Sequence, residues 1–112
     1  MKINQKKQNE IELFELDGEL DFHTSPELRD KFQEVFQKQL RKVVVNLKKV
    51  SYIDSSGLAT FVEALQKIKR YNGKLVLTDL VPAVRSVFEI AKLDKVFSLA
   101  NTEVEALQLV AQ

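Results

Sequence analysis

The run Val43-Val44-Val45-Asn46-Leu47 constrains the fold more than any other segment of the chain. It is short, β-branched and almost entirely apolar, which is typical of a central strand that is covered on both faces. Parallel sheets are covered in this way because the helices that connect their strands lie on the two faces. The run therefore predicts an α/β fold in which helices pack against a sheet.

Hydrophobic patterns elsewhere supply strands and helices in the order β-β-α-β-α-β-α-β-α. Strands are expected over residues 2–6, 10–16, 43–47, 74–78 and 95–99, with turn signals at Gln8-Asn9 and Asp17-Gly18. Phe14 breaks the alternation of the second strand, which leaves either a bulge or a strand buried on both sides. With the helices as crossovers, this order predicts a mixed, mostly parallel β-sheet with about four α-helices packed against it.

Helix boundaries are marked by capping residues. Thr24-Ser25-Pro26-Glu27 offers a capping box, or Ser25 as cap before Pro26, for a helix reaching about Leu40. Further helices are expected over residues 56–71, 82–91 and from Thr102, where Glu105 completes a second box. Asn72-Gly73 supplies a left-handed stop. The expected core positions of the last three helices are Leu58, Phe61, Val62, Leu65, Ile68, Val84, Val87, Phe88, Val104, Leu107 and Val110, and the expected outward positions of the second helix are Thr60, Glu63, Gln66, Lys67 and Arg70.

Composition excludes several classes of function. The chain has 112 residues, which fits one domain over residues 1–112, and it has no cysteine and a single histidine, His23, which argues against disulfides and a zinc site. A net charge of +1 argues against a nucleic-acid-binding protein. No apolar run reaches the roughly 20 residues of a membrane span, and the first residues lack the apolar region of a signal peptide. We therefore expect a cytoplasmic, monomeric protein without metal or cofactor.

The segment Asp54-Ser55-Ser56-Gly57 joins a strand to a helix start. Asp54, Ser55 or Ser56 can cap that helix, and Gly57 permits a close backbone approach. Capping alone favours a structural role. However, an exposed serine hydroxyl at a helix start is accessible to a kinase, and phosphorylation adds about −1.5 to −2 charge there. A partner docked on this surface would then be repelled without any change of fold.

At this point the chain resembles the STAS domain family, specifically the stand-alone bacterial anti-anti-sigma factors, also called anti-sigma factor antagonists. The resemblance covers nearly the whole chain in the right order. The matching segments are Gly18-Glu19-Leu20-Asp21 with Thr24, Val43 to Leu47, Ile53-Asp54-Ser55-Ser56-Gly57-Leu58, Asn72-Gly73-Lys74-Leu75, Pro82-Ala83-Val84 with Phe88, and Leu93-Asp94-Lys95-Val96-Phe97.

The resemblance implies a cycle of partner switching. The unphosphorylated protein would bind an anti-sigma factor that is also an ATP-dependent serine kinase, and this would free a sigma factor. The kinase would phosphorylate Ser55 and be released, and a metal-dependent serine phosphatase would restore binding. The docking surface implied by the family comprises Asp21, Thr24, Asp54, Ser55, Ser56, Gly57 and Leu58. Two departures from the family pattern are Ala59, where glycine is usual, and Val81, where a polar cap is common.

Three other functions are compatible with part of this residue pattern. Another STAS role without a phospho-switch is the first alternative, either in a different STAS-containing signalling complex or as an accessory subunit of a membrane lipid transporter. The accessory subunit fits the size of the chain and often needs no phosphorylation, but the intact Asp54-Ser55-Ser56-Gly57 motif disfavours it. A receiver domain would use Asp54 as phospho-acceptor, but it needs an acidic pair after its first strand, and Asp17 and Glu19 do not match that topology. A hydrolase could use Ser55, His23 and Asp21, but the Gly-x-Ser-x-Gly elbow is absent. The resemblance thus favours a regulatory binding protein, not an enzyme.

Overall fold

One mixed sheet organises the molecule, and its five strands lie in the order β1-β2-β3-β4-β5. The computed structural model describes all 112 residues. The β1–β2 hairpin is antiparallel, and every other neighbouring pair is parallel. The strands are β1 (Lys2–Gln8), β2 (Ile11–Leu20), β3 (Lys42–Ile53), β4 (Lys74–Thr78) and β5 (Ser98–Ala100). The predicted mixed, mostly parallel sheet is confirmed.

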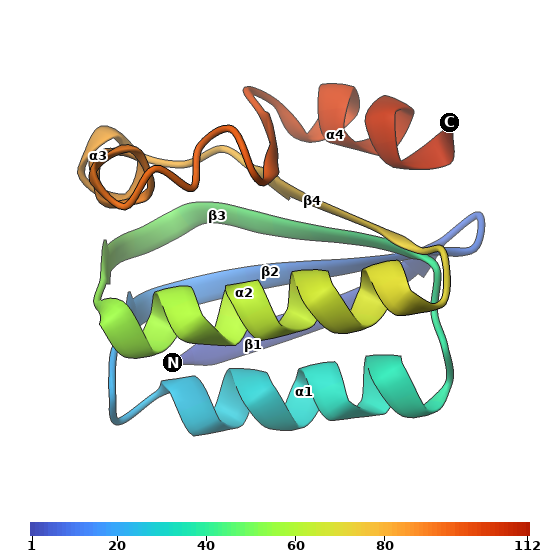
Figure 1. Cartoon of the computed structure of the whole chain (residues 1–112), viewed down its shortest axis with the longest axis horizontal. Coiled ribbons are helices and arrows are strands. Elements are labelled where there is room, and N and C mark those ends of the chain that lie inside the picture. The colour runs from blue at the N-terminus through green and yellow to red at the C-terminus, as the bar shows by residue number, and fades with distance from the viewer.

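Helices cover the two faces of this sheet unequally (Figure 1). They are α1 (Ser25–Gln37), α2 (Ser55–Arg70), α3 (Pro82–Ile90) and α4 (Glu103–Ala111). α1, α2 and α3 share a large apolar core with one face, whereas α4 covers a smaller apolar cluster on the other face. None of these helices is both long and apolar enough to cross a membrane.

A chain of phenylalanine rings fixes the first three helices to the sheet. Phe14 of β2 meets Phe32 of α1, Phe32 meets Phe61 of α2, and Phe61 meets Phe88 of α3, with centroids 6.0, 6.0 and 6.3 Å apart. Two of these ring pairs are edge-on and the third is tilted, and such geometries are favoured for aromatic contacts. Because the rings are fully buried or nearly so, they hold α1 and α2 in a defined position relative to β2.

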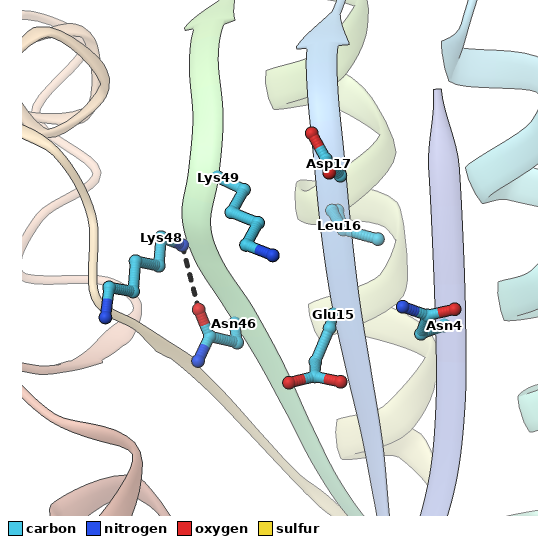
Figure 2. A pocket seen from close by; sticks show the side chains of 7 residues that line it. All are labelled: Asn4, Glu15, Leu16, Asp17, Asn46, Lys48 and Lys49. Atoms are coloured by element: carbon cyan, nitrogen blue, oxygen red, sulfur yellow. Dashed lines mark hydrogen bonds between the residues drawn. The ribbon is translucent and has the colours of Figure 1, made fainter.

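β3 extends to Ile53, so the predicted end at Leu47 was wrong. Its pairing with β2 shifts register between Glu15 and Asp17 and again between Gly18 and Glu19. Each shift places two consecutive β3 residues on the outer face, so buried residues recur every third position at Leu47, Val50 and Ile53. A strand with this spacing lacks the alternation of buried and exposed residues by which strands are predicted from sequence. Figure 2 shows the first shift, where Asn46 Oδ1 accepts a 2.8 Å hydrogen bond from the Lys48 N–H.

β2 likewise continues to Leu20, through the predicted turn at Asp17-Gly18. Gly18 has φ +129°, a conformation that side chains rarely adopt, and it lies where the register shifts. Gly18 therefore lies in β2 opposite a bulge of β3 and does not form a turn. Both faces of β2 are buried around Phe14, as one of the two sequence interpretations required. The two elongated strands carry the chain to the edge of the sheet where α1 and α2 begin.

Smaller differences have local causes. Thr60 is buried and not outward, because its hydroxyl donates to the Ser56 carbonyl at 2.9 Å inside α2. The last strand is Ser98–Ala100 and not 95–99, since a turn at Leu93–Phe97 closes on the Leu93 carbonyl. Val104 is 67% exposed and lies outside the core. The Thr102 half of the predicted capping box is confirmed by a 3.2 Å bond from the Glu105 N–H to the Thr102 hydroxyl.

Candidate functional site

The start of α2 is capped by Asp54, one of the three capping residues that the sequence left open. Its Oδ1 accepts hydrogen bonds from the N–H groups of Ser56 (2.9 Å) and Gly57 (3.1 Å). Asp54 itself has extended backbone angles, as an N-cap residue should. It follows β3 directly, so the carboxyl end of a central parallel strand feeds the helix. In open α/β sheets this edge is where ligands usually bind.

Ser55 is the first residue of α2, and its side chain is exposed. Its hydroxyl makes no hydrogen bond within the protein, whereas the Ser56 residue beside it is half-buried. The hydroxyl of Ser56 likewise makes no hydrogen bond within the protein, so the two serines differ in exposure, and the hydroxyl of Ser55 is the more accessible to another molecule. The geometry thus separates the two serines, which the residue pattern alone did not.

Gly57 is buried at the point where α2 crosses the ends of β2 and β3. A Cβ atom at this position would lie 2.7 Å from Ile53 Cγ1, 2.9 Å from Leu20 Cγ and 3.0 Å from the Leu20 carbonyl oxygen. The predicted close approach is therefore confirmed, and a side chain at this position would face the core. Leu58 is half-buried and packs on the core as well, so only part of its side chain is available at the surface.

The loop from Leu20 to Ser25 forms the second half of the site and is held by its own side chains. Asp21 Oδ1 accepts from the N–H groups of His23 (2.9 Å) and Thr24 (3.1 Å). The hydroxyl of Thr24 accepts from the Asp21 N–H (2.9 Å) and donates to the Glu19 carbonyl (2.8 Å). The predicted capping box of Thr24 with Glu27 is absent, because Thr24 is committed to this turn.

These hydrogen bonds change the acidity of Asp21. Partial desolvation acts to raise the pKa of its carboxyl group, but bonds from the Thr24 and His23 N–H groups and the Thr24 hydroxyl outweigh it, so the pKa is lowered from 3.8. A lowered pKa means that the ionised form is favoured by the folded state. The ionised carboxylate of Asp21 therefore stabilises the turn formed by residues 21–24.

We expect Asp21→Asn to lower the free energy of unfolding near neutral pH, because an amide oxygen accepts more weakly than a carboxylate. With the folded pKa below the unfolded one, the contribution of Asp21 is present above about pH 4 and is lost as pH falls through the folded pKa. Urea unfolding of both proteins between about pH 2 and 7 measures this. The two free energies should converge in acid, and a constant difference would contradict the assignment.

The two halves of the site are joined by Asp54. Its second oxygen, Oδ2, accepts a 3.1 Å hydrogen bond from the N–H of Phe22, and its own N–H donates to the Leu20 carbonyl at 3.1 Å. Phe22 is 72% exposed and lies edge-on to the His23 ring. Neither aromatic side chain was among the predicted site residues. An apolar ring inside a polar loop is the signal that could have revealed Phe22.

The structure brings the predicted site residues to one edge of the sheet, at the left of Figure 1, where β2 and β3 end and α1 and α2 begin. Their roles differ. The Asp21, Thr24 and Asp54 side chains hold backbone groups, Gly57 packs inward, and Ser55 is exposed.

The structure does not form the residue arrangements that a hydrolase or a receiver domain would need. No hydrogen bond joins the His23 imidazole to Ser55 or Asp21, since only the backbone N–H of His23 contacts Asp21. Asp54, the acceptor residue of a receiver domain, has both carboxylate oxygens engaged by backbone N–H groups. Asp17 pairs with Lys49 in the sheet, far along the strand from the Asp54 cap. Neither a catalytic triad nor an acidic phospho-acceptor centre is formed.

A separate small pocket of about 100 Å³ lies on the part of the sheet that α4 leaves open (Figure 2). Its two lysines, Lys48 and Lys49, lie beside two carboxylates, Glu15 and Asp17. The positive and negative charges of the pocket are therefore balanced. The lining residues are Asn4, Glu15, Leu16, Asp17, Asn46, Lys48 and Lys49. It does not include any residue of the Asp54 edge.

Comparison with known proteins gives consistent matches. The family model described as STAS domain matches residues 2–106. The chain is 30% identical over 108 residues to the anti-sigma F factor antagonist of Paenibacillus polymyxa, covering 96% of this chain and 92% of that protein. It is 32% identical over 106 residues to the anti-sigma-B factor antagonist of Staphylococcus aureus, covering 94% and 98%. The Bacillus cell fate determinant SpoIIAA, solved in its phosphorylated form, superposes with a TM-score of 0.77 at 24% identity, covering 97% and 99%.

Proposed function

The chain belongs to the STAS domain family, and on that premise we propose that it is an anti-sigma factor antagonist that is switched off by phosphorylation of Ser55. The unphosphorylated protein binds an anti-sigma factor in the cytoplasm and thereby frees a sigma factor. The observation that carries the proposal is the exposed hydroxyl of Ser55, at the first position of α2, on a surface whose loop and helix are held together. Relatives at 30% and 32% identity that are named as such antagonists support it.

The switching reaction is a phosphoryl transfer. The anti-sigma factor acts as an ATP-dependent kinase and passes the γ-phosphoryl group of ATP to Oγ of Ser55, with release of ADP and of the hydroxyl proton. A metal-dependent serine phosphatase hydrolyses the phosphoserine and releases inorganic phosphate. The protein itself contributes an accessible nucleophile on a fixed surface and supplies no catalytic group.

The local electrostatics keep the fold intact during this cycle. The helix dipole favours a phosphate at Ser55 by about 0.3–1 kcal/mol, whereas the neighbouring Asp54 carboxylate opposes it. Since Asp54 already holds the N–H groups of Ser56 and Gly57, the phosphate projects into solvent. What changes is therefore the surface, which gains about −1.5 to −2 charge. A protein of the same fold that was solved in a phosphorylated form is consistent with this.

We expect the cognate kinase and ATP to add one phosphate to the wild-type protein and none to Ser55→Ala. The reason is the exposure of Ser55 against the half-buried Ser56. Intact-mass measurement reads the modification, and fragmentation maps the site. Ser56→Ala is the matched control, because it removes the adjacent hydroxyl and should still be phosphorylated. An unchanged mass of the wild type, or a phosphate mapped to Ser56, would overturn the assignment.

A further inference from the structure

Asp54 makes two hydrogen bonds to the Leu20–Ser25 loop. Its N–H donates to the Leu20 carbonyl at 3.1 Å, and its Oδ2 accepts from the Phe22 N–H at 3.1 Å, while Oδ1 caps α2. The Phe22 N–H is the one amide of the loop turn that bonds outside it. The N–H groups bonded within the loop are those of Asp21, His23, Thr24 and Ser25.

We propose that Asp54 is a positioning residue that presents Phe22 to the anti-sigma factor as an anchor, so that the loop and the start of α2 dock as one rigid surface. This rests on the proposed function. It assigns Asp54 a task distinct from direct contact with the partner, because both of its oxygens are already engaged by backbone groups. Phe22 takes the role of the contact residue.

Phe22 has the properties of an anchor. It is 72% exposed, whereas Leu20, the other large apolar residue of the loop, is buried, and its ring lies edge-on to His23 with centroids 5.8 Å apart. Aromatic side chains with few rotatable bonds dominate the binding energy of many interfaces. A backbone that is already fixed loses less entropy when the ring docks. The bond from the Phe22 N–H to Asp54 provides this fixation, 32 residues away in sequence.

Substitution can separate the two tasks of Asp54. In Asp54→Asn the amide oxygen can still accept from Ser56 and Gly57, and asparagine is a good N-cap. Its NH₂ group then faces the Phe22 N–H, so two donors meet and the bond is lost. Asp54→Ser also caps α2 but has a single side-chain oxygen, which cannot serve both segments. Both variants keep the cap and the backbone bond to the Leu20 carbonyl, and lose only the side-chain bond to the Phe22 N–H.

The first measurement uses the free protein. We expect the amide of Phe22 to exchange with solvent roughly tenfold faster in Asp54→Asn and in Asp54→Ser, as for the loss of one hydrogen bond. The amides of Ser56 and Gly57, which remain capped, should change little and serve as internal controls. Unchanged exchange at Phe22 in both variants would overturn the proposal irrespective of any partner.

The second measurement is a double-mutant cycle of affinity for the purified anti-sigma factor that binds the wild-type protein. Asp54→Asn should weaken binding about tenfold in the wild-type background. In a Phe22→Ala background, which keeps the N–H but removes the ring, the same change should cost less than about threefold. A purely structural or direct-contact role of Asp54 would cost the same in both backgrounds, and that result would refute the assignment.

The outcomes distinguish this inference from the proposed function. If the wild-type protein binds no anti-sigma factor, the proposed function fails and the inference fails with it. If the wild-type protein binds and Asp54→Asn binds equally well, the proposed function stands and only the role of Asp54 falls. Faster exchange at Phe22 together with a non-additive loss of affinity supports both.

Discussion

Ser55→Asp is expected to weaken binding of the anti-sigma factor by about a thousandfold, close to 4 kcal/mol. The substitution puts a carboxylate at the exposed first position of α2, next to the Asp54 carboxylate. A partner docked closely on this surface would have to desolvate that charge or be repelled by it. The phosphoserine, with its larger charge, should weaken binding at least as much.

Isothermal titration with the purified partner measures the affinity. Ser55→Asn is the matched control, because it has the size of aspartate without the charge, and Ser55→Ala removes the hydroxyl alone. Both should bind within about tenfold of the wild type if charge is the cause. Tight binding by Ser55→Asp would instead favour a STAS role without a phospho-switch, such as an accessory subunit of a lipid transporter.

The same variant should leave the fold unchanged. The hydroxyl of Ser55 makes no hydrogen bond within the protein, and the helix dipole partly offsets the new charge beside Asp54. Surface substitutions of this kind usually alter the free energy of unfolding by less than about 0.5 kcal/mol. A large fall in melting temperature would show that the loss of binding comes from unfolding and not from charge.

Gly57→Ala is expected to lower the free energy of unfolding by about 1–3 kcal/mol, the usual penalty for an overpacked core. In an open helix this change would be stabilising by up to about 1 kcal/mol. Here the added Cβ would lie 2.7 Å from Ile53 Cγ1 and 3.0 Å from the backbone oxygen of Leu20. Because the Leu20 and Ile53 side chains are buried, they cannot move aside easily.

Thermal or urea unfolding measures the effect, with about 4–8 °C expected for each kcal/mol in a domain of this size. Ala59→Gly is the matched control, since it exchanges the same two residue types at an exposed position of the same helix. It should cost about 1 kcal/mol or less, through helix propensity alone. A stabilised Gly57→Ala protein would show that α2 does not approach β2 as closely as described.

Local sequence patterns were sufficient to predict the order of the strands and helices. They also predicted the helix starts at Thr102 and near Asp54. Residues 74–78 have the predicted bounds of β4 because their apolar run is short and is bounded by Gly73 and Asp79. The ends of β2 and β3 were missed, since bulges replace alternation by a spacing of three at Leu47, Val50 and Ile53. A bulge depends on the neighbouring strand and has no reliable signature in one segment.

The candidate site was predicted in part. Asp54, Ser55 and Gly57 are recognisable because a strand, a capping residue and a helix follow one another in sequence. Thr24 was assigned a helix-capping role that it does not have, because its hydroxyl instead bonds to Glu19 and Asp21. Phe22 was missed, because the sequence shows an aromatic residue in a polar loop but only the folded loop shows that its ring is exposed.

By itself, the sequence determined the α/β class, the order of strands and helices, and the position of a serine at the start of α2. These follow from hydrophobic periodicity and capping chemistry, which act between neighbours along the chain. Only the tertiary structure decided which serine is open, which face Gly57 presents and how Asp54 reaches Phe22. Those features depend on contacts between segments about 30 residues apart, as between Phe22 and Asp54 (32 positions), and such contacts exist only once the sheet has brought β2 and β3 side by side.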